Sequence, residues 1–128
     1  MRLLLDTHVL LWWVEDSEQL SPEARRLIAD EQNECYVSFV SAWEMAIKAA
    51  IGKLKLAVPV KRYIQEQLPA NAIKLLPLSI DHVTAVESLP LHHRDPFDRL
   101  LVVQAQQELL SLVSVDASFD QYGVARIW

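Results

Sequence analysis

The sequence is poor in residues that several common functional classes require. Its 128 residues include two glycines, Gly52 and Gly123, and one cysteine, Cys35. A chain with so little glycine can hardly build a glycine-rich phosphate loop, which argues against nucleotide hydrolysis of that type. A lone cysteine cannot form an internal disulfide, and its presence in an apolar segment fits a reducing cytoplasm.

Long apolar runs and an excess of positive charge are also missing. The longest apolar runs, such as residues 9–14, are too short to span a bilayer, and Asp6 interrupts the first one without a signal-peptide cleavage site. We therefore expect a cytoplasmic protein that does not enter a membrane. With 17 acidic and 12 basic residues the formal net charge is −5, which by itself disfavours a nucleic-acid partner. That argument fails if the acids gather around divalent cations.

Short apolar segments alternate with helical ones along the whole chain. The length fits one domain over residues 1–128. The alternation predicts a three-layer α/β/α domain with a central parallel sheet and right-handed crossovers. The expected strands are 2–5, 34–38, 73–78 and 112–115, with a short last strand in 125–128. The expected helices are 8–15, 17–31, 42–51, 63–68, 80–88 and 97–110.

Two carboxylates stand three residues apart where the last long helix begins. Asp95 precedes Pro96 and has the position of a helix N-cap. On a helical period Asp98 falls in line with Leu101, Val102, Ala105 and Leu109, the stripe that should face the core. That alignment aims Asp98 into the rim of a cleft. The alternative is an ordinary acid at the positive end of the helix dipole.

Three other acids are expected at the same edge of the sheet. Asp6 follows the first strand and Asp116 the fourth, and the carboxyl ends of parallel strands share one edge. Glu44 lies in the first turn of the helix that follows the second strand. Each has a simpler alternative: an N-cap for Asp6, and for Glu44 a capping box with Ser41 plus an ion pair with Lys48.

Several unpaired carboxylates at one place would raise one another's pKa and weaken the fold, and a divalent metal resolves that conflict. A set of hard oxygen ligands suits Mg²⁺ or Mn²⁺ better than Zn²⁺. A zinc site built from His92, His93 and Asp95 is disfavoured because adjacent histidines point in different directions. Such metal ions can activate water against a phosphodiester.

One segment of the chain carries a cluster of basic residues, in which lysines alternate with apolar residues. It comprises Lys53 and Lys55, followed by Lys61 and Arg62. Such a cluster is usually only a solvated surface. If the domain binds nucleic acid, this is the first place to expect phosphate contacts.

Four segments together resemble the PIN domain, and within it the VapC-type ribonuclease toxins of bacterial toxin–antitoxin pairs. The resemblance covers nearly the whole chain and is carried by residues 4–8 (LLDTH), 38–44 (SFVSAWE), 93–101 (HRDPFDRLL) and 112–116 (LVSVD). It implies Mg²⁺- or Mn²⁺-dependent hydrolysis of single-stranded RNA. The acidic quartet of the family matches four residues, which would bind metal or orient metal-bound water: Asp6, Glu44, Asp98 and Asp116.

The resemblance also bears on the residues around that quartet. It leaves Asp95 as a cap, and it places Thr7 and Ser114 at small hydroxyl positions near the metal site, where a threonine is commoner than Ser114. Arg94 and Arg99 are candidates for phosphate contacts, with simple surface charge as the alternative.

Members of the resembled family are typically homodimers held by an antitoxin, a segment of which lies in an apolar groove. Of the adjacent Trp12 and Trp13, one can be core while the other serves such a surface. Two other interpretations stay open. A receiver-like domain would need a late lysine, and none follows Lys74. A PIN-like binding module without activity is the stronger rival.

Overall fold

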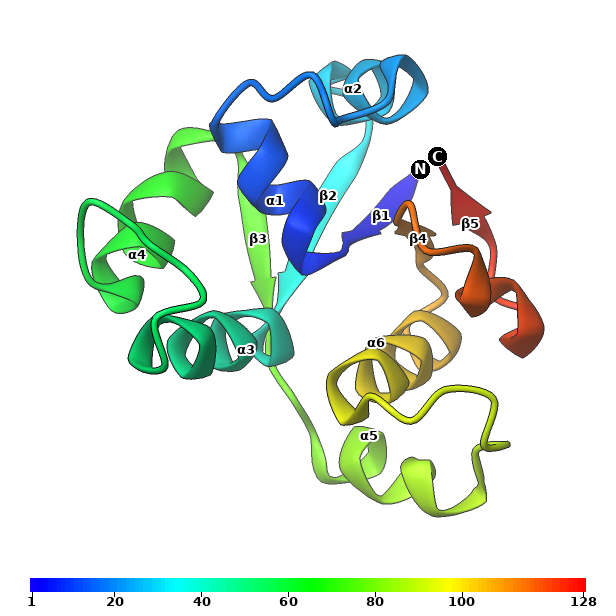
Figure 1. Cartoon of the computed structure of the whole chain (residues 1–128). Helices are drawn as coiled ribbons and strands as arrows, with labels where there is room; N and C mark the ends of the chain where they lie inside the picture. Colours follow the sequence, from blue (N-terminus) through cyan, green and yellow to red (C-terminus); the bar gives the residue numbers. More distant parts are fainter.

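The computed structural model describes all residues, 1–128, as helices packed on both sides of a five-stranded sheet (Figure 1). The strands are all parallel, in the order β3-β2-β1-β4-β5. The predicted three-layer α/β/α fold is therefore confirmed. The strand bounds are β1 Arg2–Leu5, β2 Glu34–Ser38, β3 Ile73–Leu76, β4 Ser111–Val113 and β5 Arg126–Ile127.

Six α-helices and two 3₁₀ segments connect the strands. No helix combines the length and the apolar character that a membrane span needs. The helix bounds are α1 Thr7–Val14, α2 Pro22–Ala29, α3 Phe39–Ala50, α4 Val60–Ala70, α5 Ile80–Ala85 and α6 Pro96–Gln107, with 3₁₀ segments η1 Val86–Ser88 and η2 Ala117–Tyr122.

The central strand β1 is buried on both faces. Leu3, Leu4 and Leu5 are fully enclosed, and successive side chains of a strand point to opposite faces. Leu3 and Leu5 pack with side chains of α1, α2 and α4, whereas Leu4 packs with side chains of α6 and η2. In Figure 1, α2 lies above the sheet, and α5 and α6 lie below it. Burial on both faces explains why this strand is a continuous apolar run.

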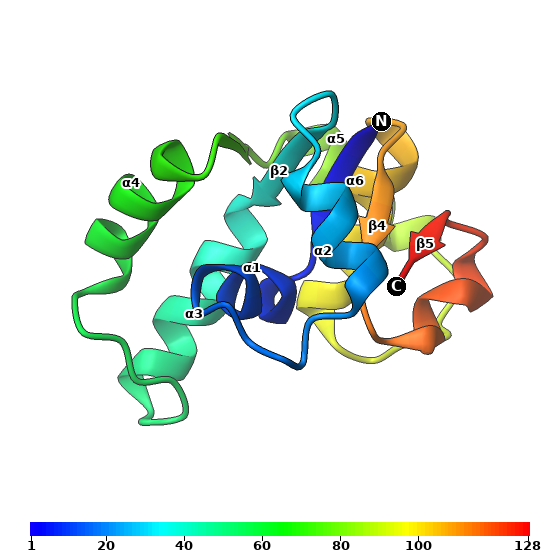
Figure 2. The same cartoon turned by 90° about the horizontal axis from the view of Figure 1, so that it is seen from above.

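Helix α3 lies across the carboxyl end of the sheet and contributes to both sides of the core. Its Met45 packs on the α1 and α2 side, and its Val40 packs on the α6 side. In Figure 1 the arrows of β2 and β3 point down toward α3, and Figure 2 shows the same elements from above. The helices α1 and α3 begin directly at the carboxyl ends of β1 and β2.

The start of α3 differs from the prediction. The helix begins at Phe39 because Ser38, not Ser41, is its N-cap: the Ser38 Oγ accepts a hydrogen bond from the Val40 N–H at 2.9 Å. The predicted capping box between Ser41 and Glu44 is therefore wrong. Ser41 is instead buried inside the helix, which leaves its hydroxyl available to the neighbouring α1.

Four α-helices end in a left-handed residue, which reverses the chain sharply: Asp16 after α1, Gly52 after α3, Ala72 after α4 and Leu109 after α6. After α3, Gly52 has φ +78°, and the Lys53 N–H donates to the Lys48 carbonyl at 2.8 Å. After α6 the same position is held by Leu109, with φ +55°. Leu109 was expected on the buried stripe of α6, but it is 83% exposed because the helix has ended before it. A leucine in this conformation carries backbone strain that a glycine does not.

We expect the substitution Leu109→Gly to stabilise the protein by about 0.5–1 kcal/mol, because glycine adopts the left-handed conformation without strain and little apolar burial is lost. Gln106→Gly, at an exposed position inside the same helix, should destabilise it by about 1 kcal/mol. Urea unfolding of the two variants checks this prediction. A loss of stability in Leu109→Gly would contradict it.

Candidate active site

The structure brings the four predicted acids to the carboxyl edge of the sheet. Asp6 follows β1, Asp116 lies beyond β4, Glu44 stands in α3, and Asp98 lies in the first turn of α6. The negative charges of Asp6, Glu44 and Asp116 all act on the carboxyl group of Asp98. The four side chains therefore form one electrostatically coupled group, which we call the acidic site.

Asp6 is fixed by the pairing of β1 with β4. Leu5 lies opposite Val113, so the next residues in each strand, Asp6 and Ser114, are neighbours. The Asp6 Oδ2 accepts a hydrogen bond from the Ser114 hydroxyl at 2.7 Å, and its Oδ1 accepts one from the Thr7 N–H at 2.7 Å. Asp6 is also the N-cap of α1. Asp6 therefore caps α1 and also belongs to the acidic site, so these two roles are not alternatives.

Glu44 is buried, with 8% of its surface exposed, between α1 and α3. The Thr7 hydroxyl donates to its Oε1 at 2.6 Å, and a further hydrogen bond of 2.9 Å joins the hydroxyls of Thr7 and Ser41. Its Oε2 lies 2.8 Å from the Lys48 Nζ, so the ion pair expected from the sequence is present. It is a half-buried contact of the site, not an exposed surface pair.

Asp98 and Asp116 share one partner, His93, in the loop before α6. The His93 Nε2 lies 3.1 Å from the Asp98 Oδ2 and 3.5 Å from the Asp116 Oδ2. The ligand atoms of these three residues all lie within 4.8 Å of one another. They form the tightest group of potential metal ligands in the protein.

The environment of the His93 ring fixes which nitrogen faces the acids. Its Nδ1 accepts a hydrogen bond from the Asp95 N–H at 3.1 Å, so in the neutral ring the proton resides on Nε2. The backbone N–H of His93 donates to the Tyr122 hydroxyl at 2.8 Å, and the His93 ring stacks on Phe119. His93 therefore presents an N–H donor to the carboxylates, where a cation would otherwise lie.

Sequence reasoning missed His93 as a site residue. It was considered with His92 and Asp95 as a zinc site, and the structure does not bring those three together: His92 packs on Tyr122, and Asp95 caps α6. The predicted cap role of Asp95 is confirmed, since its Oδ1 accepts from the Phe97 N–H at 2.8 Å. The position of His93 depends on a loop conformation that no periodicity encodes.

The pKa values reflect the crowding of negative charge. Burial, and then the charges of Asp6, Asp95, Glu44 and Asp116, raise the pKa of Asp98 to about 8. Burial also raises the pKa of Asp6.

Asp116 behaves differently from these two acids. Its partial burial by itself raises the pKa, but hydrogen bonds from Ser118 and His93 outweigh that effect and hold the pKa below its usual value. At neutral pH the site thus holds a proton on Asp98 and negative charge on Asp116.

This arrangement fits a divalent cation. The donor set consists of carboxylate oxygens with hydroxyls around them, and no thiolate is nearby, which matches hard ions such as Mg²⁺ or Mn²⁺. The acids also lack an adequate internal counter-charge, because neither Asp6 nor Asp98 forms an ion pair with a lysine or arginine. A bound cation would take the place of the Asp98 proton, and it would replace the Nε2–H of His93 as the positive partner of the carboxylates.

The two arginine candidates differ from each other. Arg94 is exposed and forms no hydrogen bond or ion pair, so its proposed contact with phosphate stays a prediction. Arg99 is buried, so the alternative of simple surface charge is wrong for it. Its guanidinium donates to the carbonyls of Pro90 (3.0 Å) and Leu89 (3.1 Å), with longer contacts to those of Val86 and His93. The phosphate contact of Arg99 stays a prediction. Arg99 shapes the loop that carries His93.

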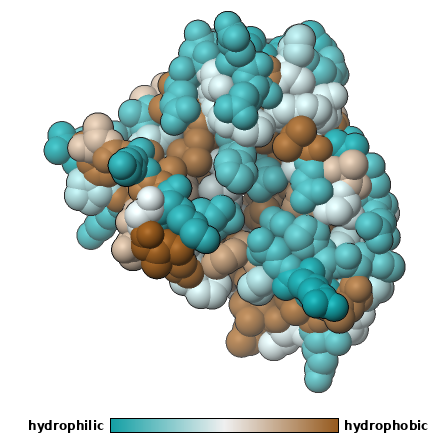
Figure 3. Space-filling model, in the orientation of Figure 1, coloured by the Kyte–Doolittle hydropathy of each residue, from teal (hydrophilic) through white to brown (hydrophobic).

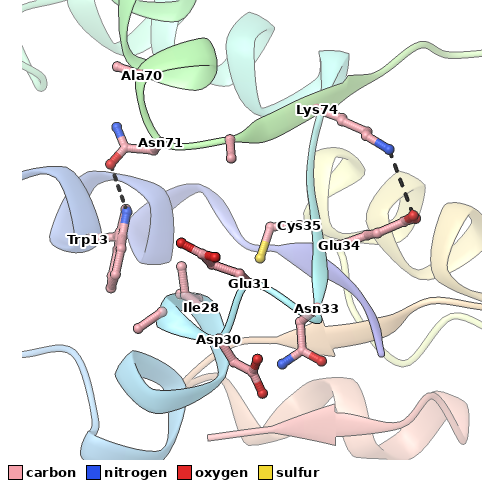
Figure 4. A pocket seen from close by; sticks show the side chains of 12 residues that line it. Trp13, Ile28, Asp30, Glu31, Asn33, Glu34, Cys35, Ala70, Asn71 and Lys74 are labelled. Atoms are coloured by element: carbon pink, nitrogen blue, oxygen red, sulfur yellow. Dashed lines mark hydrogen bonds and ion pairs between the residues drawn. The ribbon is translucent and has the colours of Figure 1, made fainter.

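None of the cavities is lined by an acid of the acidic site. A cavity of about 580 Å³ lies at the opposite edge of the sheet, between Trp13, Cys35 and Asn71 (Figure 4). The Trp13 Nε1 donates to the Asn71 Oδ1 at 3.1 Å there. Burial raises the pKa of the Cys35 thiol to about 11, so Cys35 is no nucleophile at neutral pH.

Comparisons with known proteins agree with this fold. The model of the PIN domain matches residues 3–125, and the chain therefore belongs to the PIN domain family. Ribonuclease VapC22 of Mycobacterium tuberculosis is 30% identical over 115 residues, which cover 89% of this chain and 86% of that protein.

Solved structures show the same fold at lower sequence identity. VapBC2 from Rickettsia felis, bound to a DNA fragment from its promoter, contains a chain with TM-score 0.68 and 15% identity that covers 99% of this chain and 98% of its own. FitAcB from Neisseria gonorrhoeae contains one with TM-score 0.64 and 20% identity, covering 98% and 96%.

We expect Asp98→Asn to raise the metal-free melting temperature at neutral pH and above. Folding of the wild type must either take up a proton at Asp98 or bury its charge beside the other acids, and an amide avoids both costs. In the wild type the folded state holds the Asp98 proton more tightly than the unfolded state does, with a pKa of about 8 against a usual value of 3.8. Stability should therefore fall as pH rises between these values. Melting curves across this range check the slope, which should flatten in Asp98→Asn. An equal slope in both proteins would contradict the assignment.

Arg99→Met should destabilise the protein by about 2–4 kcal/mol, because the loop carbonyls lose a buried charged donor. Arg94→Met is the matched control and should change stability by less than about 0.5 kcal/mol, since its side chain is exposed. Chemical unfolding of both variants distinguishes the two arginines, and equal stabilities would refute a structural role for Arg99.

Proposed function

We propose that this protein is a metal-dependent endoribonuclease that hydrolyses phosphodiester bonds of single-stranded RNA, and that it is the toxin of a toxin–antitoxin pair. The observation that carries the proposal is the acidic site: coupled carboxylates at the carboxyl edge of the sheet, with a proton on Asp98 where a cation fits. The ribonuclease name of its relative VapC22 supports the substrate class.

We further propose Mg²⁺ or Mn²⁺ as the ion, held by Asp6, Glu44, Asp98 and Asp116. When bound, such an ion would supply an activated water and stabilise the leaving oxygen of the phosphodiester. The chain's own groups orient the ligands. The hydroxyls of Thr7 and Ser114 each hold one carboxylate oxygen, of Glu44 and Asp6 respectively. The second oxygen of each acid is also held, by the Lys48 Nζ and by the Thr7 N–H.

His93 and the exposed Arg94 have roles that follow from their positions. The His93 Nε2–H faces Asp98 and Asp116 from the solvent side of the loop. Once the carboxylates bind a cation, this N–H is free to donate to an oxygen of the substrate phosphate. Arg94, one residue further along the loop, can pair with the same backbone from outside. Both groups orient RNA against the acids.

Protein partners have an apolar surface available on α3. Phe39, Trp43, Ile47 and Ile51 recur every four residues and are all exposed. In Figure 3, apolar side chains gather over this helix beside polar surface. A groove of about 460 Å³ continues the stripe toward α4. An exposed stripe of this kind marks a protein interface, and we propose that a second copy of the chain and the antitoxin cover it.

The tryptophans of α1 contribute less to this interface than expected. Both Trp12 and Trp13 are half-buried, so the division into one core and one surface residue is wrong. Trp12 packs against His8 and Trp128, and Trp13 donates a hydrogen bond to Asn71. The large exposed apolar side chains lie on α3 instead.

Purified protein should cleave a labelled single-stranded RNA of mixed sequence with Mg²⁺ or Mn²⁺, and EDTA should stop the reaction. Asp6→Asn should reduce the rate at least about 100-fold, because it removes a ligand charge at the end of β1. Gel analysis of the products checks both expectations. Glu108→Gln, an acid far along α6 from the site, is the matched control and should retain activity. Metal-independent cleavage, or an Asp6→Asn variant as active as the wild type, would contradict the proposal.

A further inference from the structure

A second, basic pocket adjoins the acidic site on the side of α1. Its volume is about 430 Å³, and it lies between α1 and the carboxyl end of α3. Thr7 lines this pocket and also donates to Glu44, so Thr7 links the pocket to the acidic site. The polar side chains around it are otherwise cationic or neutral: His8, Lys48 and Lys53.

The turn after α3 places Lys53 there. Gly52 adopts φ +78°, and the N–H groups of Lys53 and Leu54 both donate to the Lys48 carbonyl, at 2.8 and 3.1 Å. This is the usual way in which a left-handed glycine ends a helix and folds the next residues back over its last turn. The sequence thus returns Lys53 to the flank of α3, beside Lys48.

Of the two lysines, Lys53 carries the uncommitted charge. Lys48 is paired with Glu44 at 2.8 Å, whereas Lys53 makes no ion pair. In a chain with a net charge of −5, an unpaired lysine in a pocket next to an acidic site has no partner within the protein. An anion bound from solution would supply the missing partner of Lys53.

The other basic residues of the cluster are placed differently. Arg62 pairs with Glu66 at 2.7 Å. Lys61 lines the apolar groove between α3 and α4, and Lys55 lines a separate cavity. The cluster that is continuous in the sequence is therefore divided in space, and of its members only Lys53 shares a pocket with Thr7, the hydrogen-bond donor to Glu44.

An aromatic surface continues from the pocket along α1. The exposed ring of His8 stacks on Trp12, with centroids 5.6 Å apart and planes 26° apart, and Trp12 in turn contacts Trp128. Bases of single-stranded nucleic acid stack on such exposed rings, while lysines bind the backbone. Phosphate-binding charge and a stacking surface thus lie side by side.

We propose that this pocket binds a backbone phosphate of the RNA strand adjacent to the bond that is cleaved, with Lys53 as the phosphate contact and His8 as the platform for the neighbouring base. The inference rests on the proposed ribonuclease function. It assigns a direction to the substrate, which leaves the acidic site along α1 and not across α3.

Equilibrium binding tests the pocket independently of cleavage. In the Asp6→Asn background with Mn²⁺ present, a fluorescent single-stranded RNA of mixed sequence should bind about tenfold more weakly when Lys53→Ala is added, because one charge-assisted contact is lost. The slope of log Kd against log salt concentration should fall by about 0.7, the value for one phosphate contact on a single strand. Lys55→Ala, an exposed lysine two residues away, is the matched control and should change Kd by less than about twofold.

Cleavage by the otherwise wild-type protein separates the two proposals. If RNA is cleaved with metal, Lys53→Ala should raise KM about tenfold and leave kcat unchanged. A first outcome is RNA binding that depends on Lys53 while no metal-dependent cleavage occurs. That result would support the phosphate pocket and refute the ribonuclease function. The opposite result is metal-dependent cleavage together with equal KM and equal Kd values for Lys53→Ala and Lys55→Ala. It would refute phosphate binding in this pocket and support the ribonuclease function.

Discussion

Repulsion among carboxylates at the carboxyl edge of the sheet is the constraint on which the rest of the site depends. Burial of Asp98, together with the nearby charges of Asp6, Glu44 and Asp116, raises its pKa to about 8. Such a cluster weakens the fold unless something compensates for it. In this structure the compensation is partial and comes from hydroxyls, one lysine and the N–H of His93. The chain is therefore built to accept a divalent cation.

The scaffold withstands this repulsion because the acids are attached to its most rigid parts. β1 is buried on both faces and pairs with β2 and β4, so Asp6 and Ser114 are held at the ends of paired strands. α3 is packed into both halves of the core. Asp98 stands in the first turn of α6, and Asp116 caps η2 just beyond β4. His93 lies in the loop before α6, and the buried Arg99 holds that loop through its carbonyls. Flexible surroundings would let the acids move apart.

The sequence was sufficient to predict the sheet, its parallel strands and the position of the acids, because alternating periods and strand ends are local signals. Local signals also identified Asp95 as a cap. They failed at Ser38, since the residues after it, Phe39 and Val40, are equally compatible with a strand. They failed at Arg99 and His93 for another reason. The partners of both side chains lie in the loop before α6, whose conformation depends on tertiary contacts.

The most direct test measures the protons that leave the protein when it binds a cation. Titration with Mn²⁺ at pH 7, followed by calorimetry in buffers of different ionisation enthalpy, gives that number. Because Asp98 has a pKa of about 8 without metal, we expect close to one proton to be released per ion bound, and none in Asp98→Asn. Binding without proton release in the wild type would contradict a cation site formed by these coupled carboxylates.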